Sequence, residues 1–152
     1  MNDIMQRLDL TWPEKLGALA YLCREKGCGE ADMPVSHRFT PGWYIREMFI
    51  PQGTYFIGRA HKLGHRVTLD SGRIRLISEH QQSFVEPPFE VMTVPGFQTV
   101  FEALTDVYGS TYHPNPTNSR NIDELEDSVF YPADDVFRIG AGVVGRFKEL
   151  TV

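Results

Sequence analysis

Residues 53–72 of the chain read GTYFIGRAHKLGHRVTLDSG. Glycine opens and closes this stretch, and the β-branched and aromatic residues between favour strands, so the stretch predicts a hairpin. The alternation of side chains along a strand would place Arg59 and His61 on the same face. Lys62, His65 and Arg66 follow within a few positions. The hairpin therefore carries a concentrated set of candidate binding residues.

Similar short runs of strand-forming residues extend on both sides of the hairpin. Turn-forming segments such as PQG, DSG, EPP and VPG separate these runs, and no long helical pattern interrupts them. Such a series of short strands predicts an all-β sandwich or barrel. The predicted strands are WYIREMFI (43–50), TYFIGRAH (54–61), HRVTLD (65–70), RIRLIS (73–78), FEVMTV (89–94), QTVFEAL (98–104) and DVYGSTYH (106–113).

One amphipathic helix is predicted ahead of the strands. Pro13 suits the first position of a helix, and apolar residues recur at positions 16, 19, 20 and 23. The segment ADMPVSHRFTPG that follows is punctuated by prolines and predicts an extended connector. The pattern leaves open whether the helix packs on its own β domain or on a second subunit.

A short acidic helix is predicted after the strands. Residues 121–135 contain six acidic residues and no lysine or arginine, which is typical of a solvated helix followed by an irregular tail. We therefore divide the chain into a helical extension at residues 1–35, a β-barrel with its short helix at 36–132, and a tail at 133–152.

The composition narrows the classes of function. A chain of 152 residues suits one domain, and no apolar run approaches the roughly 18 residues that a membrane span needs. The first ten residues lack the features of a secretory signal, so we expect a cytoplasmic protein with Cys23 and Cys28 as free thiols. The formal net charge of -5 argues against binding to a nucleic-acid polymer.

The chain contains no complete copy of the common catalytic or cofactor-binding motifs. The glycines of GAGVVG (140–145) have the spacing of a dinucleotide-binding loop, but only seven residues follow, too few for the rest of a βαβ unit. We interpret these glycines as a flexible or turning tail. The chain also lacks the nucleophile elbow, the phosphate-binding loop and the HExxH zinc motif. No residue is therefore predicted to be catalytic.

The spacing of Gly53, His61, His65 and Gly72 resembles the first motif of the cupin superfamily, with Arg59 where the family has its first histidine. VPGFQTV (94–100) is similar to the second cupin motif, although Thr99 stands at the usual ligand position. The resemblance implies an all-β, cupin-like jelly-roll barrel, with the side chains of Arg59 and His61 facing its interior. It also implies homodimerisation, because cupins commonly pair.

A closer resemblance is to small single-domain cupin-like proteins of tailed phages, over roughly residues 43–132. This resemblance implies a phage-encoded protein that acts in the host cytoplasm. The chain departs from the group after Pro95-Gly96. The matching residues are Arg46, Glu47, Ile50, Pro51, Gly53, Thr54, Gly58, His61, Lys62, His65, Gly72, Arg73 and Ile74, with His113 in a later matching position.

A metal site is one hypothesis for these residues. His61 and His65 would be ligands, with His113 or a carboxylate such as that of Glu47 as the third, and imidazole suits Zn, Fe or Ni. Arg59 opposes this hypothesis, because a guanidinium cannot ligate a metal and repels a cation. The corresponding function is a metal-dependent oxygenase, isomerase or epimerase that acts on a small polar substrate.

We favour an anion site for these residues. Arg59 offers a planar fork of donors for phosphate or carboxylate, and Lys62 adds a point charge. The histidines His61, His65 and His113 would donate hydrogen bonds, and an aromatic such as Tyr55 would stack on a nucleobase. The corresponding function is non-catalytic binding of a nucleotide-derived molecule, for instance to sequester a host defence signal.

A structural reading of the same segment also stays open. Lys62, Arg66, Arg73 and Arg75 are each expected to face solvent on hairpins, where ion pairs contribute little stability. An inward-facing Arg59 would need a partner, and Glu47 on the preceding strand is the expected one. In this reading the protein is a structural or interaction protein, and the strands fill their own interior.

Overall fold

The computed structural model describes residues 2–25, 33–132 and 142–146. The chain forms two compact units, one made of residues 1–30 with 132–152 and the other of residues 31–131. Each unit is described by itself below. None of the described helices has an apolar stretch long enough to span a bilayer.

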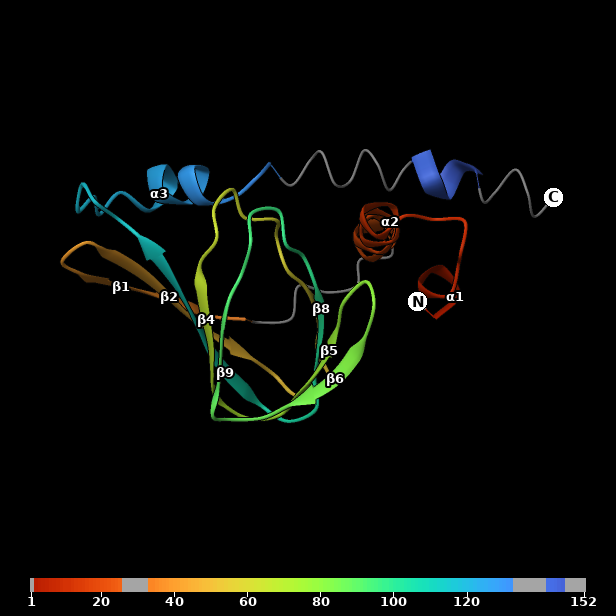
Figure 1. Ribbon diagram of the computed structural model, residues 1–152, viewed down its shortest axis with the longest axis horizontal. Coiled ribbons are helices and arrows are strands. Elements are labelled where there is room, and N and C mark those ends of the chain that lie inside the picture. Colours follow the sequence, from red (N-terminus) through yellow and green to blue (C-terminus); the bar gives the residue numbers. More distant parts are fainter. Residues whose placement is uncertain (1, 26–32, 133–141, 147–152) are drawn as a thin grey trace. The chain divides into compact units, whose positions relative to one another are not determined.

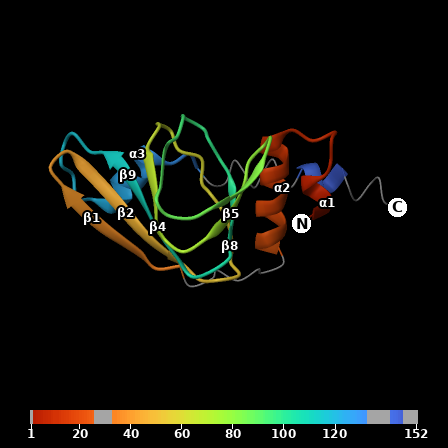
Figure 2. The same ribbon diagram turned by 60° about the horizontal axis from the view of Figure 1, so that its bottom comes forward.

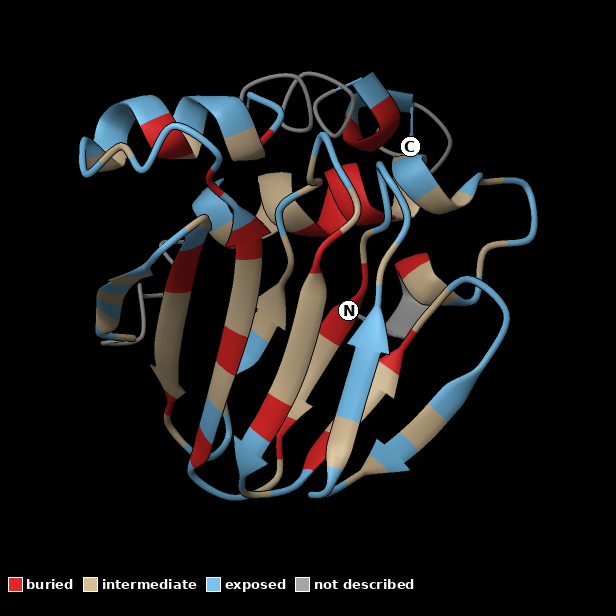
Figure 3. Ribbon diagram, turned by 60° about the vertical axis from the view of Figure 1, so that its left-hand side comes forward, coloured by how far each residue is buried: buried red, intermediate tan, exposed pale blue. Residues whose placement is uncertain are grey.

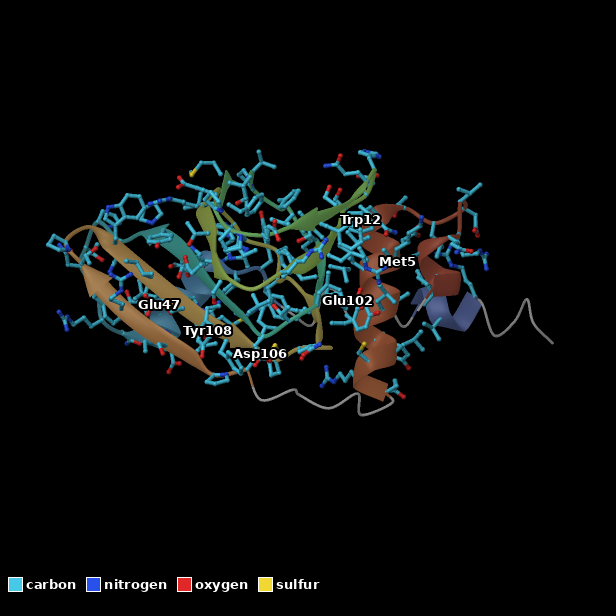
Figure 4. The ribbon with its side chains drawn as sticks, turned by 90° about the horizontal axis from the view of Figure 1, so that it is seen from below. Met5, Trp12, Glu47, Glu102, Asp106 and Tyr108 are labelled. Atoms are coloured by element: carbon cyan, nitrogen blue, oxygen red, sulfur yellow. The ribbon has the colours of Figure 1, made fainter. Side chains whose placement is uncertain are left out.

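The first unit is helical. It contains α1 (Asn2–Met5) and α2 (Trp12–Glu25), and Figure 4 labels Met5 and Trp12 on them. α2 begins with a capping box: the Glu14 carboxylate accepts a hydrogen bond from the Thr11 N–H at 2.9 Å, and the Thr11 hydroxyl accepts one from the Glu14 N–H at 3.4 Å. Leu16 and Leu19 are buried on the predicted apolar face.

The glycine-rich segment near the C-terminus belongs to the same unit, and our interpretation of it as a flexible tail was wrong. Residues 142–146 are helical, Val143 and Val144 are buried, and Arg146 forms an ion pair with Glu14 of α2 at 3.0 Å. Burial of two consecutive valines gives this segment an apolar anchor that the glycine spacing did not reveal.

The second unit consists of two antiparallel sheets and one helix (Figures 1 and 2). The five-stranded sheet has the order β1 (Val35–Thr40), β2 (Trp43–Ile50), β9 (Val107–Pro114), β4 (Arg66–Ser71) and β7 (Phe89–Met92). The four-stranded sheet has the order β3 (Tyr55–Ile57), β8 (Val100–Ala103), β5 (Ile74–Ile77) and β6 (Gln82–Val85).

The pairing of the strands is that of a jelly roll. β2 pairs with β9, β3 with β8, β4 with β7 and β5 with β6, so that the chain folds as one long antiparallel ribbon. Successive pairs of this ribbon alternate between the two sheets. The predicted jelly-roll class is therefore confirmed, while the expected closed barrel is corrected to two separate sheets.

The apolar core lies between these sheets at one end of the sandwich. Ile50, Leu69 and Val107 come from the five-stranded sheet, and Ile74 and Ala103 come from the other. Figure 3 shows the buried segments on the strands as red bands that alternate with more exposed ones. The five-stranded sheet contributes three of these residues and the four-stranded sheet contributes two. Neither sheet could therefore bury its apolar face alone.

Most predicted elements are present, and two strands were missed. β2 has the predicted bounds, whereas β3 covers only three residues of a predicted eight. β1 lies within the predicted connector, and β6 was not predicted. α3 (Ile122–Val129) is the predicted acidic helix, and the Asn121 side chain caps it by accepting a hydrogen bond from the Glu124 N–H at 3.2 Å.

Gly72 gives a test of the turn between β4 and β5. It has a φ of +91°, and an added Cβ would collide with the Asp106 carbonyl oxygen and approach the Thr105 hydroxyl to 2.9 Å. Gly42 is a matched control, because its φ is +79° and its Cβ would meet nothing within 4 Å. We expect Gly42→Ala to lower the free energy of unfolding by about 1 kcal/mol and Gly72→Ala by about 2–4 kcal/mol, measured by urea denaturation. Equal losses would contradict the close backbone approach at Gly72.

Candidate metal centre

Strand pairing brings two of the predicted ligands together. β9 pairs with β4 so that Tyr112 lies opposite Arg66. His65 directly precedes Arg66 and His113 directly follows Tyr112, so the antiparallel register places these histidines side by side. His61 lies in the loop before β4, where an isolated β-bridge holds it against the residue that follows α3. Two positions in the segment before β4 and a third at the end of β9 thus meet at one end of the sandwich.

The three imidazole rings form a compact stack. The distances between ring centroids are 3.7 Å for His61 and His65, 5.0 Å for His65 and His113, and 5.4 Å for His61 and His113. One ring nitrogen from each residue lies within 4.8 Å of the others. His65 is 5% exposed and His113 is 3% exposed, while His61 is half-buried. Within the described ranges this is the only group of three His, Cys, Asp or Glu residues close enough to share a metal ion.

Thr93 fixes the orientation of the His65 ring. Its hydroxyl donates a hydrogen bond to the His65 carbonyl oxygen at 3.2 Å and accepts one from the His65 backbone N–H at 3.1 Å. The same hydroxyl lies 2.9 Å from the ring Nδ1. The hydroxyl therefore contacts both the backbone and the ring of His65, which restricts rotation of the ring. Because Nδ1 is engaged by Thr93, Nε2 is the ring nitrogen left for a ligand.

His113 and His61 also have a nitrogen free to bind a ligand. The Thr111 hydroxyl lies 3.0 Å from Nε2 of His113, which leaves Nδ1 for a ligand. Both ring nitrogens of His61 are buried, and neither makes a hydrogen bond of good geometry in the described structure, although the backbone of Arg59 lies close enough to the ring to oppose the lowering of its pKa. A buried polar atom without a partner costs free energy, and such atoms are expected where a bound group completes the site.

The environment keeps all three rings neutral. Burial lowers the pKa of His61 to about 3, and the neighbouring His65, Arg46 and Arg59 lower it further. Burial, with the other two histidines and Arg46, also lowers the pKa of His113 to about 3. The pKa of His65 is likewise lowered by burial. Neutral imidazole is the form that binds metal, so these rings have their lone pairs available at neutral pH.

The segment that contains α3 is attached to the loop that carries His61. The Lys62 backbone N–H donates to the Val129 carbonyl at 2.8 Å, and the Tyr131 N–H donates to the Ala60 carbonyl at 3.0 Å. The Lys62 ammonium group donates to the Asp127 carbonyl at 2.8 Å, at the C-terminal end of α3. Figures 1 and 3 show α3 at the end of the sandwich where β9 ends and β4 begins.

Phe130 packs directly against the histidines. Its ring centroid lies 4.6 Å from that of His61 and 6.4 Å from that of His113, and the residue is buried. The guanidinium carbons of Arg59 and Arg46 lie 4.3 Å and 4.9 Å from the same ring centroid. Phe130 therefore covers one side of the site, and both arginines contact its ring.

The donor set fits a divalent transition metal. A metal about 2.1 Å from each nitrogen in tetrahedral geometry needs the nitrogens about 3.4 Å apart, so binding would draw the three rings together by roughly 1 Å. Three neutral imidazoles suit Zn, Fe, Ni or Cu, and three protein ligands leave a position open for water or substrate. In the described part of the chain no carboxylate joins the group. His61, His65 and His113 could hold such an ion.

Arg59 does not face the interior, and this expectation was wrong. β3 ends at Ile57, so Arg59 lies outside a regular strand and the alternation argument fails there. Its side chain is exposed and donates a hydrogen bond to the Tyr131 carbonyl at 3.3 Å. Glu47, labelled on β2 in Figure 4, forms its ion pair with Arg38 at 3.0 Å rather than with Arg59.

The other predicted ligand residues lie away from the histidines. Lys62 is exposed and held at the end of α3. Tyr55 is 44% exposed and belongs to the four-stranded sheet. Its neighbour Phe56 stacks on Phe101, which packs on the core, so Tyr55 points to the other face of β3.

Four residues of the site were missed as functional candidates: Arg46, Thr93, Thr111 and Phe130. The alternation in β2 carried a signal for Arg46, since Tyr44, Met48 and Ile50 share its face and are apolar. Thr111 stands two residues before His113 on the same strand face. No local pattern marks Thr93 or Phe130, because their roles depend on contacts between segments that are distant in the sequence.

The comparisons with known proteins concern the fold. No protein-family model and no curated protein matches the chain. Salicylate 1,2-dioxygenase from Pseudoaminobacter salicylatoxidans is similar in structure, with a TM-score of 0.51 and 11% identity over 74% of this chain and 33% of that chain. At this level of identity the likeness supports the jelly-roll fold alone.

Other similar solved structures are cupin domains. They include the Cupin_2 domain of an XRE family transcriptional regulator from Enterobacter cloacae, with a TM-score of 0.47 and 14% identity over 56% of this chain and 100% of that chain. A cupin-2 domain containing protein from Shewanella frigidimarina has a TM-score of 0.47 and 6% identity over 62% of this chain and 92% of that chain.

The neutral histidines predict a pH dependence of stability in metal-free protein. Their pKa values are lower in the folded state than the ordinary 6.5, so between pH 6.5 and about 3 the unfolded state binds more protons. The contribution of these neutral histidines to the free energy of unfolding is therefore fully present above pH 6.5 and decreases as the pH falls. We expect the buried His113 alone to cost roughly 1 kcal/mol per pH unit between pH 6.5 and 5, measured by urea denaturation in chelator.

Two variants isolate this effect. His113→Gln should flatten the stability profile between pH 7 and 5, and the half-buried His61→Gln should do so if the first variant fails to fold. His80→Gln is the control, since its side chain is 86% exposed. A His113→Gln profile with the wild-type slope would contradict a neutral, buried His113.

Proposed function

We propose that this protein binds one divalent transition metal ion through His61, His65 and His113 and acts as a metal-dependent enzyme on a small polar molecule. One observation carries the proposal: one ring nitrogen from each of three neutral histidines lies within 4.8 Å of the others, and both buried nitrogens of His61 lack a well-formed hydrogen bond. Zn, Fe and Ni are the expected metals. Oxygenase, isomerase and epimerase reactions are the classes that such a centre would serve.

The residues around the histidines have separate roles in this proposal. A bound metal would supply Lewis-acid or redox activation at its open position. Thr93 and Thr111 hold the rings of His65 and His113 in the orientation that presents a lone pair. Phe130 excludes water from one side of the site and so lowers the local dielectric constant.

The positions of the residues favour the metal hypothesis over the anion hypothesis. The anion hypothesis required Arg59 at the point where the histidines converge, and Arg59 lies instead at the exposed side of Phe130. The convergence of His65 with His61 and His113 supports the metal hypothesis. Arg59 does not occupy a ligand position, so this objection to a metal site no longer applies. Its positive charge still lowers the pKa of His61.

Metal analysis tests the proposal directly. We expect purified protein to carry about one equivalent of Zn, Fe or Ni by elemental analysis, and chelator to lower its melting temperature. His61→Ala should abolish stoichiometric metal, because loss of one of three ligands leaves an incomplete site. His80→Ala should retain the metal. Wild-type protein that takes up no metal, with a melting temperature unaffected by chelator, would refute the proposal.

Thr93→Val tests the orientation of His65 separately. Loss of the hydroxyl should weaken metal affinity by about 10–100-fold while leaving all three ligands in place, measured by competition with a chromophoric chelator. Thr117→Val is the control because Thr117 is exposed and outside the site. Equal affinities of the two variants would show that the hydroxyl of Thr93 does not orient the ligand.

A second candidate is metal-independent binding of an anion, such as a nucleotide-derived molecule that a phage-encoded protein would sequester. The guanidinium groups of Arg46 and Arg59 beside Phe130 favour it. Thermal-shift measurements with a nucleotide panel, with and without chelator, distinguish the candidates. Stabilisation by a nucleotide that is undiminished in chelator would favour metal-independent binding.

The oligomeric state and the location in a host cytoplasm are further parts of the proposal. Native mass spectrometry of the sample used for elemental analysis would report subunit number, metal and any ligand carried through purification. A metal-free monomer without a ligand would favour the structural or interaction role instead.

A further inference from the structure

Arg46 is a largely buried cation with incomplete hydrogen bonding. It lies on β2, on the face that carries Tyr44 and the core residue Ile50, and its side chain is 15% exposed. Its Nε atom is buried and has no hydrogen-bond partner in the described structure, a feature that Arg66 and Arg75 share. Its ion pair with Glu126 of α3 measures 3.5 Å, and its guanidinium also interacts with the side chain of Tyr44. A charged hydrogen bond is ordinarily about 2.7–2.9 Å long, so the Glu126 contact does not satisfy the hydrogen-bonding capacity of the guanidinium group.

Other arginines of the same unit are paired more closely. Arg66 and Glu90 are 2.8 Å apart, Arg75 and Glu102 are 2.5 Å apart, and both arginine side chains are more exposed than that of Arg46. A guanidinium has five donors, and burial raises the cost of leaving them unpaired. Arg46 therefore has both the greater need for an anionic partner and the longer ion pair.

The guanidinium of Arg46 lies beside the three histidines. It is 4.9 Å from the centroid of the Phe130 ring, and the His61 ring is 4.6 Å from the same centroid. The β2–β9 register places Arg46 opposite Thr111, whose hydroxyl bonds to His113. The positive charge of Arg46 lowers the pKa of both His61 and His113. Geometry and electrostatics thus agree that Arg46 and the histidines share one site.

The charges of this site are unbalanced once a metal is present. The three histidines are neutral and no carboxylate of the described residues joins them, so a divalent ion would keep its two positive charges. Arg46 adds a third, and Glu126 offsets one at most. In a site shielded by Phe130 this excess is costly unless an anion enters. A ligand that carries the anion into the site is the simplest means of balancing it.

We propose that the substrate of this centre is a small organic acid whose carboxylate binds the fork of Arg46 while a neighbouring hydroxyl or carbonyl oxygen takes the open position on the metal. This inference rests on the proposed metal function. The planar guanidinium matches a carboxylate through two parallel hydrogen bonds, and a lysine could not reproduce this arrangement. Arg46 is a binding residue in this proposal, and the exposed Arg59 is not required.

The test uses the full-length protein loaded with Co²⁺, whose visible absorption reports ligands that reach the metal. Titration with glycolate should change the spectrum and saturate. Glycolamide is the matched neutral probe, because it keeps the hydroxyl and replaces the carboxylate by an amide. We expect the dissociation constant of glycolate to rise at least about tenfold in Arg46→Gln, which corresponds to loss of one charged hydrogen-bonding partner.

Two further variants complete the experiment. Arg38→Gln is the control, because Arg38 lies on the neighbouring strand β1, is exposed and pairs with Glu47. It should bind glycolate within about threefold of the wild type. Arg46→Lys retains the charge without the fork and should bind glycolate with intermediate affinity. It also replaces Arg46→Gln if that variant fails to fold or to bind Co²⁺.

The outcomes separate the two levels of the proposal. Wild-type protein that binds no Co²⁺, or that binds it equally after His61→Ala, overturns the metal function and this inference with it. Normal Co²⁺ binding with equal affinities for glycolate and glycolamide, or with unchanged glycolate affinity in Arg46→Gln, overturns the organic-acid inference alone. A carboxylate preference that is lost in Arg46→Gln and kept in Arg38→Gln supports it.

Discussion

The antiparallel register between β9 and its two neighbours is the constraint on which the rest of the structure depends. On one side β9 pairs with β2, which places Thr111 opposite Arg46, and on the other it pairs with β4, which brings His113 beside His65. A shift of either pairing by one residue would turn His113 away from the interior, because side chains alternate faces along a strand. The apolar core at Ile50 and Val107 fixes this register from the opposite end of the same strands.

This division of the sandwich explains how an interior can contain histidines and an arginine. At one end both sheets contribute apolar side chains to the core, and their burial supplies the favourable free energy. At the other end the histidines remain neutral, and threonine hydroxyls pair with His65 and His113. The two nitrogens of His61 and the Nε of Arg46 are among the buried polar atoms that lack a well-formed hydrogen bond, which costs free energy at this end. Buried polar atoms without hydrogen-bond partners are typical of ligand-binding sites that contain no ligand.

The segment after the last strand completes the site from outside the sheets. α3 is too short to be stable alone, and its capping residue Asn121 and its backbone bonds to the His61 loop hold it in place. Through this attachment Phe130 packs against His61 and His113, and the guanidinium groups of Arg46 and Arg59 both lie over its ring. The two arginines differ in exposure, since the Arg46 side chain is 15% exposed and Arg59 is exposed.

The sequence by itself determined the class of fold, the bounds of β2, the turn glycines and the acidic helix, because these follow from local patterns. It also singled out His61, His65 and His113 as candidate ligands. It could not place Arg59, since the alternation argument assumed a strand that ends at Ile57. It also could not identify Arg46 as the interior cation, or Thr93 and Phe130 as supporting residues. Only the tertiary structure decided these points, because strand pairing and loop attachment join segments whose proximity no local pattern encodes.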